Sequence, residues 1–146
     1  MSRLLALLPF VFLCACKSTE SGDIAWRSLV RSPFSGVAEA GAHVARNSTE
    51  WHELWSLHGR AVIRPSSAPE VDFEREMAIL VSGGESPTAG WSLEVTGVTL
   101  ERGALVVHAR VVAPPADSLQ AQVVTAPGEV IVTSRRDEPV RVRITR

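Results

Sequence analysis

The fold class is decided by residues 77–95, which read MAILVSGGESPTAGWSLEV. The stretch opens with an apolar run at 77–81, and such a run, ended here by glycines, is typical of a central strand covered on both faces. Apolar and polar residues then alternate, so that Trp91, Leu93 and Val95 share one face of a second strand. We therefore expect two strands joined by a short, glycine-containing loop.

Outward from this stretch, the chain shows one helix and several further strands. Residues 48–58 place Trp51, Leu54, Trp55 and His58 at i, i+3, i+4 and i+7, which is the spacing of one helical face. Strands are also expected in the segments 36–46, 105–113, 122–125, 129–133 and 140–145. The sequence thus predicts an α+β fold: mainly an antiparallel β sheet or sandwich, with one helix at about 48–58 packed on it.

The first 15 residues differ in composition from the rest, because twelve of them are apolar. Arg3 precedes the apolar run of residues 4–13, which is shorter than the roughly 20 residues that a membrane span needs. The run ends in LCAC, residues 13–16, and polar residues follow at once. This ending resembles a bacterial lipobox, so we expect residues 1–15 to be a lipoprotein signal peptide and Cys16 to be the lipidation site.

The lipobox resemblance implies how the chain is placed in the cell. Acyl chains on Cys16 would hold the protein on a membrane, since each buried CH₂ contributes about 0.8 kcal/mol. Lys17 stands where an Asp would mark retention at the inner membrane, so in a Gram-negative host we expect the outer membrane, on its periplasmic or surface face. Residues 16–35 are then expected to be a lipidated tether and residues 36–146 the β-rich domain.

Several function classes are disfavoured by composition and spacing. The 15 basic and 16 acidic residues give a net charge of −1, which is no footprint for nucleic acid. His52 and His58 lie about 240° apart on the expected helix, so they cannot share a zinc ion as a zincin pair does. Residues 84–88 begin like a nucleophile elbow but lack its final glycine. We expect no catalytic residue, no metal and no cofactor.

The loop between the two central strands is the candidate binding site. Its glycines permit close backbone approach, its proline stiffens the turn, and its tryptophan offers a large contact surface at low entropic cost. The residues expected to contact a protein partner are Gly84, Pro87, Thr88, Ala89, Gly90 and Trp91. The alternative is a plain connection in which Trp91 is the first core residue of the following strand.

The chain from about residue 43 to 133 is similar to the C-terminal domain of the protease complex subunit PrcB family. The similarity rests on four motifs in order: Trp51 to Trp55 in the helix, Val71-Asp72-Phe73, the strand from Met77 to Gly84, and the loop Pro87-Thr88-Ala89-Gly90-Trp91. Within the loop, Ala89 stands for a glycine of the family and Trp91 for a tyrosine. The resemblance implies a non-catalytic envelope lipoprotein that associates with a surface protease.

Two alternatives stay open beside this accessory role. Residues 86–90 are also similar to a loop of chagasin-like inhibitors of cysteine proteases, although those domains lack a helix with the Trp51 and Trp55 pair. That resemblance implies inhibition by the 84–91 loop. A third reading is a lipoprotein that binds an unidentified ligand. The expected partners are a membrane, through the lipid anchor, and an envelope protease.

Overall fold

The computed structural model describes residues 22–59 and 67–146. The expected signal peptide 1–15 and the expected lipidation site Cys16 lie outside the described residues. Within the described part of the chain one helix and eight strands follow in the order β1 (Gly22–Asp23), β2 (Trp26–Ser32), β3 (Ala40–Ala45), α1 (Ser48–Gly59), β4 (Glu76–Gly83), β5 (Ser92–Glu101), β6 (Ala104–Val112), β7 (Gly128–Ser134) and β8 (Val140–Thr145).

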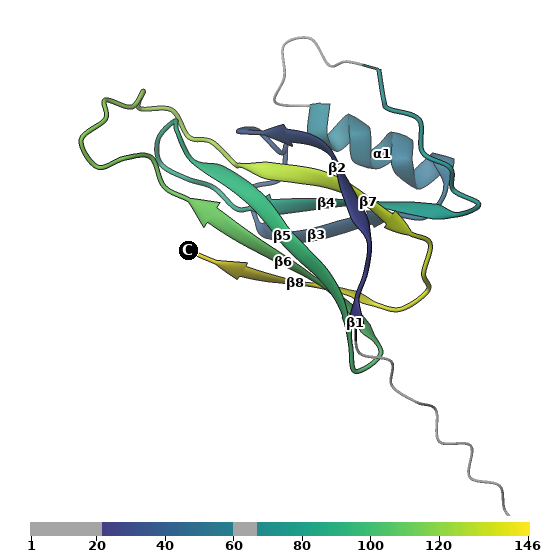
Figure 1. Ribbon diagram of the computed structural model, residues 1–146. Coiled ribbons are helices and arrows are strands. Elements are labelled where there is room, and N and C mark those ends of the chain that lie inside the picture. Colours follow the sequence, from purple (N-terminus) through teal and green to yellow (C-terminus); the bar gives the residue numbers. More distant parts are fainter. Residues whose placement is uncertain (1–21, 60–66) are drawn as a thin grey trace, which may run out of the picture.

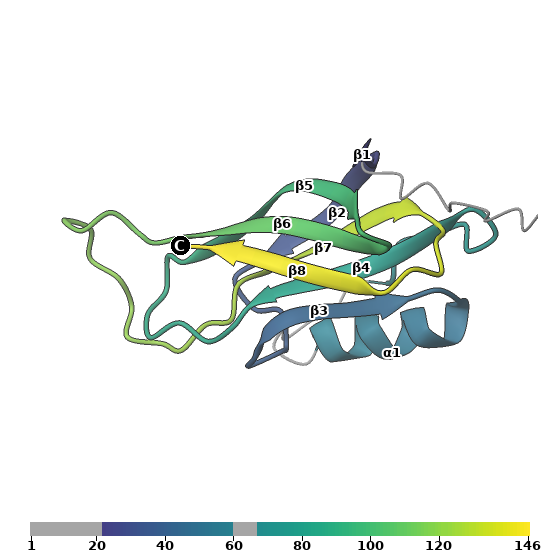
Figure 2. The same ribbon diagram turned by 90° about the horizontal axis from the view of Figure 1, so that it is seen from below.

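The strands form two four-stranded sheets that pack face to face (Figure 1). The outer sheet has the order β1-β5-β6-β8, and the inner sheet has the order β2-β7-β4-β3. Each neighbouring pair is antiparallel except β6 and β8, which run parallel. Figure 2 shows three layers, with the inner sheet between the outer sheet and α1. The α+β class, mainly antiparallel β with one helix packed on it, is confirmed.

Strand β4 shows why the run at 77–81 is apolar on both faces. Met77, Ile79 and Val81 face the outer sheet, and all three are completely buried. The intervening Ala78 and Leu80 belong to the second cluster, where they pack under α1 with Trp51 and Leu54. Side chains of a strand alternate between its two faces, so a strand covered on both sides must be apolar throughout.

Helix α1 begins where the sequence provides a cap. The Asn47 side-chain oxygen accepts the N–H of Glu50 at 2.9 Å, and the Glu50 carboxylate accepts the N–H of Arg46 at 2.7 Å. This second hydrogen bond lowers the pKa of Glu50. Trp51 and Leu54 are buried against the inner sheet, as the periodicity predicts.

Two segments differ from the sequence-based expectation. Residues 22–32, expected within the tether, form β1 and β2, which pair with β5 and β7. Because β1 joins the outer sheet and β2 the inner one, this stretch closes one side of the sandwich and the folded domain includes residues before 36. The strand expected at 122–125 is wrong: in this segment only Thr125 forms a β bridge, with Ser86, and Val123 and Val124 are exposed.

Candidate protein-binding site

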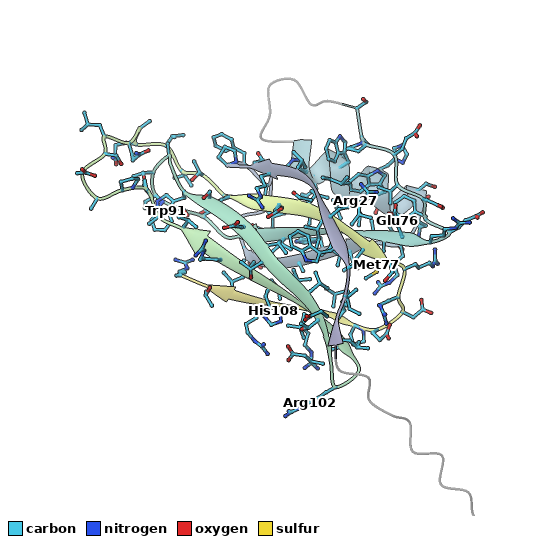
Figure 3. The ribbon with its side chains drawn as sticks, viewed as in Figure 1. Arg27, Glu76, Met77, Trp91, Arg102 and His108 are labelled. Carbon is cyan, nitrogen blue, oxygen red and sulfur yellow. The ribbon has the colours of Figure 1, made fainter. Side chains whose placement is uncertain are left out.

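One end of the sandwich carries two loops, residues 84–91 between β4 and β5 and residues 113–127 between β6 and β7. Figure 1 shows both at the same end, with the longer 113–127 loop projecting beyond the sheets. In Figure 3 Trp91 marks this end, and Arg102, in the turn between β5 and β6, marks the opposite end, where β1 also lies. We call residues 84–91 and 113–127 together the loop end.

The root of the 84–91 loop is fixed by a buried polar joint. The hydroxyls of Ser35 and Ser82, both fully buried, lie 3.1 Å apart, and Ser82 donates to the Val37 carbonyl at 3.0 Å. Ser82 Oγ also accepts the N–H of Gly84 at 3.2 Å. Gly84 has a φ of 79°, and a Cβ there would lie 3.2 Å from the Ala40 nitrogen. A glycine is therefore needed where β4 turns into the loop.

The middle of the 84–91 loop is joined to the 113–127 loop. Ser86 and Thr125 exchange backbone hydrogen bonds of 2.8 and 2.9 Å. The Thr125 hydroxyl donates to the Thr88 carbonyl at 2.9 Å, and the Ala89 N–H donates to the Ala121 carbonyl at 3.0 Å. These contacts make the two loops one structural unit.

Gly90 shows how closely the two loops approach. Its φ is 86°, and a Cβ at this position would lie 2.8 Å from the Cβ of Pro114. Ala89, which stands for a glycine of the resembled family, has no positive φ, because the left-handed positions of the loop are Gly84 and Gly90. The alanine is therefore compatible with this loop conformation.

Trp91 is half-buried and packs against the core between the two sheets. Its indole N–H donates to the Thr88 hydroxyl at 3.2 Å, so the ring helps to fix the conformation of the 84–91 loop. This geometry agrees with the alternative reading of Trp91 as a core residue where the following strand starts, because Trp91 directly precedes β5. It also leaves Trp91 only partly available to a partner.

The 113–127 loop supplies the exposed apolar surface that sequence reasoning missed. Leu119 is fully exposed, Val123 is 44% exposed and Val124 is 59% exposed. Together with Val112 at the end of β6, they are the exposed large apolar side chains of the described residues. The sequence does indicate a loop here, because turn-forming residues stand at both of its ends: Pro114 and Pro115 at the start, and Pro127 and Gly128 at the end.

Of the residues expected to contact a protein partner, some are therefore exposed at the loop end and others are buried. Pro87 and Gly90 are exposed, and Thr88 and Ala89 are half-exposed beside the 113–127 loop. Gly84 is buried at the root, so its role is conformational. Exposed apolar side chains joined to a rigid loop are typical of protein recognition sites.

A second group of polar residues lies on the outer face of the outer sheet. His108 Nε2 is 2.9 Å from the Thr99 hydroxyl and 3.3 Å from Glu101 Oε1, and Arg143 pairs with the same carboxylate at 3.3 Å. Hydrogen bonds from Thr99 and Arg143 lower the pKa of Glu101. Both the hydroxyl and the carboxylate contact the same imidazole nitrogen, whereas a catalytic triad uses one nitrogen for each. The group therefore lacks triad geometry.

Within residues 22–59 and 67–146, no three His, Cys, Asp or Glu side chains are grouped as metal ligands would be. His52 is exposed, while His58 is buried at the other end of the helix. Among these residues, no helix has the length and apolar character to cross a bilayer.

A groove of about 580 Å³ lies between the start of α1 and residues 68–76. Its wall includes Trp51, Phe73, Asp72 and Glu76. Trp51 is only 3% exposed, and its indole N–H is already bonded to the Pro69 carbonyl at 3.0 Å. The groove therefore offers no free tryptophan ring or indole donor to a small ligand.

The fold and the loop end together define a helix-backed β sandwich with an exposed apolar loop surface. Residues 77–134, from β4 to the end of β7, match the family model described as PrcB C-terminal. The match confirms the resemblance over this segment and includes both loops of the loop end. The family is that of a protease complex subunit. No curated protein and no solved structure matches the chain.

Proposed function

We propose that this protein is a non-catalytic, lipid-anchored accessory subunit of a cell-envelope protease complex, and that it contacts its partner through the loop end. Two findings at the loop end support this proposal. The family match includes both loops, and the 113–127 loop exposes Leu119, Val123 and Val124. The exposed part of an apolar side chain gains nothing from folding, but it could contribute to binding when a partner covers it.

The proposed anchor and the proposed binding surface are compatible in space. Gly22 lies six positions after Cys16, so the intervening chain spans at most about 20 Å. In Figure 1, β1 lies at the end opposite the two loops. A lipid on Cys16 would therefore keep the β1 end near the outer membrane and direct the loop end away from it, toward a protein partner.

Inhibition of a cysteine protease by the 84–91 loop is the second candidate function. It is favoured by the same exposed tip, Pro87 to Gly90. It is disfavoured by α1, whose Trp51 and Trp55 ring centroids lie 5.3 Å apart at an interplanar angle of 50°, in a layer that chagasin-like domains lack. The two functions separate in one assay, because an inhibitor lowers the activity of an added papain-like protease and an accessory subunit leaves it unchanged. We expect no change.

The proposed association is tested by co-purification. The tagged full-length protein is isolated in mild detergent from membranes of the organism that makes it, and protease activity is measured on fluorescent casein. We expect protease activity to co-purify with the wild-type protein. The triple variant Leu119→Ser, Val123→Ser, Val124→Ser should retain at least about tenfold less of this activity, because burying one such side chain contributes about 1.5–3 kcal/mol to binding. Equal activity with both proteins would contradict the role of the loop end.

The control is Arg102→Ser, which changes an exposed side chain at the opposite end of the sandwich. It should retain the wild-type amount of protease activity. The anchor has its own test, because Cys16→Ser should abolish incorporation of radiolabelled palmitate. Labelling that persists in this variant would overturn the proposed lipidation site.

A further inference from the structure

Strand β8 is an edge strand with an unpaired side. It is the last strand of the outer sheet and, among the described residues, pairs only with β6, in parallel register. The Leu105 N–H donates to the Pro139 carbonyl at 2.9 Å, which sets the phase of this ladder. In a parallel pair alternate residues face the neighbour, so Arg141 and Arg143 direct their backbone groups toward β6. The N–H and C=O groups of Val140, Val142 and Ile144 therefore point to the free edge.

The side chains of β8 alternate between the two faces of the outer sheet. Val140, Val142 and Ile144 are half-buried and pack against the core between the sheets, whereas Arg141 and Arg143 are exposed. Ala42 and Val44 of β3, the edge strand of the inner sheet, are likewise only half-buried against this core. Strands β3 and β8 lie close to each other on this side of the sandwich, and these apolar side chains remain partly accessible to solvent there.

The exposed face of β8 is cationic. Among the described residues, Arg141 and Arg146 have no ion-pair partner, and Arg143 shares the Glu101 carboxylate with His108. If two copies of the chain joined β8 to β8, arginines would lie opposite or diagonal to arginines, and like charges in such positions are destabilising. The charge pattern therefore disfavours a second copy and favours an acidic strand.

The other edges are less suited to strand addition. β2 is interrupted by a bulge at Leu29, and β1 contains two residues. The sequence of β3, AGAHVA, contains no Asp, Glu, Lys or Arg to select a partner. Bulges and very short strands are the usual protection of sheet edges, and β8 has neither.

We propose that the free edge of β8 binds an extended segment of a partner protein in which acidic and apolar residues alternate. The added strand would accept and donate hydrogen bonds at Val140, Val142 and Ile144. Its acidic side chains would lie beside Arg141 and Arg143, and its apolar side chains would cover the half-buried side of the sandwich. This is β-strand addition, in which main-chain hydrogen bonds supply affinity and alternate side chains supply specificity. The proposal is independent of the loop end.

The test uses the full-length protein in mild detergent and two fluorescein-labelled seven-residue peptides, one alternating valine with glutamate and one alternating valine with lysine. Fluorescence anisotropy should show tighter binding of the glutamate peptide. Arg141→Glu should weaken that binding about threefold to tenfold and strengthen binding of the lysine peptide, since reversal turns an exposed attraction into a repulsion. Arg102→Glu, the same charge change at an exposed position away from β8, should leave both affinities unchanged.

Amide hydrogen exchange provides the second readout and locates the bound peptide. The glutamate peptide should slow exchange at Val142 and Ile144, whose N–H groups become bonded, and not at Arg143, whose N–H already faces β6. The proposal is overturned if the glutamate peptide does not bind, if both peptides bind equally, if Arg141→Glu has no effect, or if exchange slows on another strand instead.

Discussion

β4 and the loop end adjoin in the chain but use apolar residues in opposite ways. In β4 the residues from Met77 to Val81 are completely buried, on one side against the outer sheet and on the other against α1. In the loop end, Leu119, Val123 and Val124 face solvent. Burial of the β4 side chains away from water stabilises the fold. The exposed surface of the loop-end side chains can be buried only by contact with another molecule.

Stability and recognition are therefore separable in this domain. The Ser35 and Ser82 joint and the hydrogen bonds between the two loops hold the loop end in place without using its exposed apolar side chains. Substitutions in β4 should therefore change the free energy of unfolding, and substitutions at the exposed tip should change binding alone.

The largest expected effect on stability is in β4. Ile79→Ala removes a fully buried side chain between the sheets and should lower the free energy of unfolding by about 2–5 kcal/mol, measured by urea denaturation. Ile79→Val, the matched control, should cost about 0.5–1.5 kcal/mol. A loss below 1 kcal/mol for the alanine variant would show that β4 is not the centre of the core.

The same comparison explains what the sequence could predict. The run in β4 and the Trp51, Leu54 and His58 spacing of α1 are local patterns set by a buried environment, so their elements are predictable. Val123 and Val124 resemble a strand by the same criterion, but the structure gives them no neighbouring strand and leaves them exposed. Apolar β-branched residues indicate a strand only when a partner strand exists, and that depends on distant parts of the chain.

Non-local pairing also accounts for the other differences. β2 was not expected because its sequence, WRSLVRS, has little apolar alternation, and its place is determined by pairing with β7 about a hundred residues later. The sequences of β6 and β8 likewise do not indicate that the two strands pair in parallel. The candidate loop 84–91 was predictable from its glycines and proline, whereas its union with residues 113–127 was not.

The next effect should come from the joint between the two loops. Gly90→Ala forces a side chain into a left-handed backbone position and against Pro114, and should lower the free energy of unfolding by at least about 1–2 kcal/mol. Gly41→Ala, where a Cβ meets nothing within 4 Å and φ is not positive, should have little effect or a slightly stabilising one. Equal stabilities of the two variants in thermal unfolding would contradict the tight junction at Gly90.

A pH-dependent effect is expected at the end of α1. Burial lowers the pKa of His58, and a backbone hydrogen bond with Ser35 only partly opposes this. A group whose folded pKa is lowered contributes fully above its unfolded pKa, about 6.5, and this contribution is lost as pH falls below it. The His58→Gln variant should therefore lose less stability than wild type between pH 7 and pH 5, followed by urea denaturation at each pH.

The exposed His52 on the same helix provides the comparison for this prediction. His52→Gln should keep the pH dependence of the wild type. If His58→Gln and wild type lose the same stability between pH 7 and pH 5, protonation of the buried imidazole does not destabilise the fold.

The smallest expected change in stability is at the exposed tip. Leu119→Ser should alter the free energy of unfolding by less than about 0.5 kcal/mol, because the side chain is fully exposed. Circular dichroism during thermal unfolding measures this. A larger loss would mean that the tip contributes to the fold and would remove the contrast with β4.

The central claim, that the loop end contacts a protease, is tested most directly by photo-crosslinking in intact cells. A photoreactive amino acid is placed at position 119 in one variant and at position 102, at the opposite end of the sandwich, in another. We predict a crosslinked product at position 119 that contains a protease subunit, and none at position 102. A protease crosslink only at position 102, or none at either position, would contradict the account.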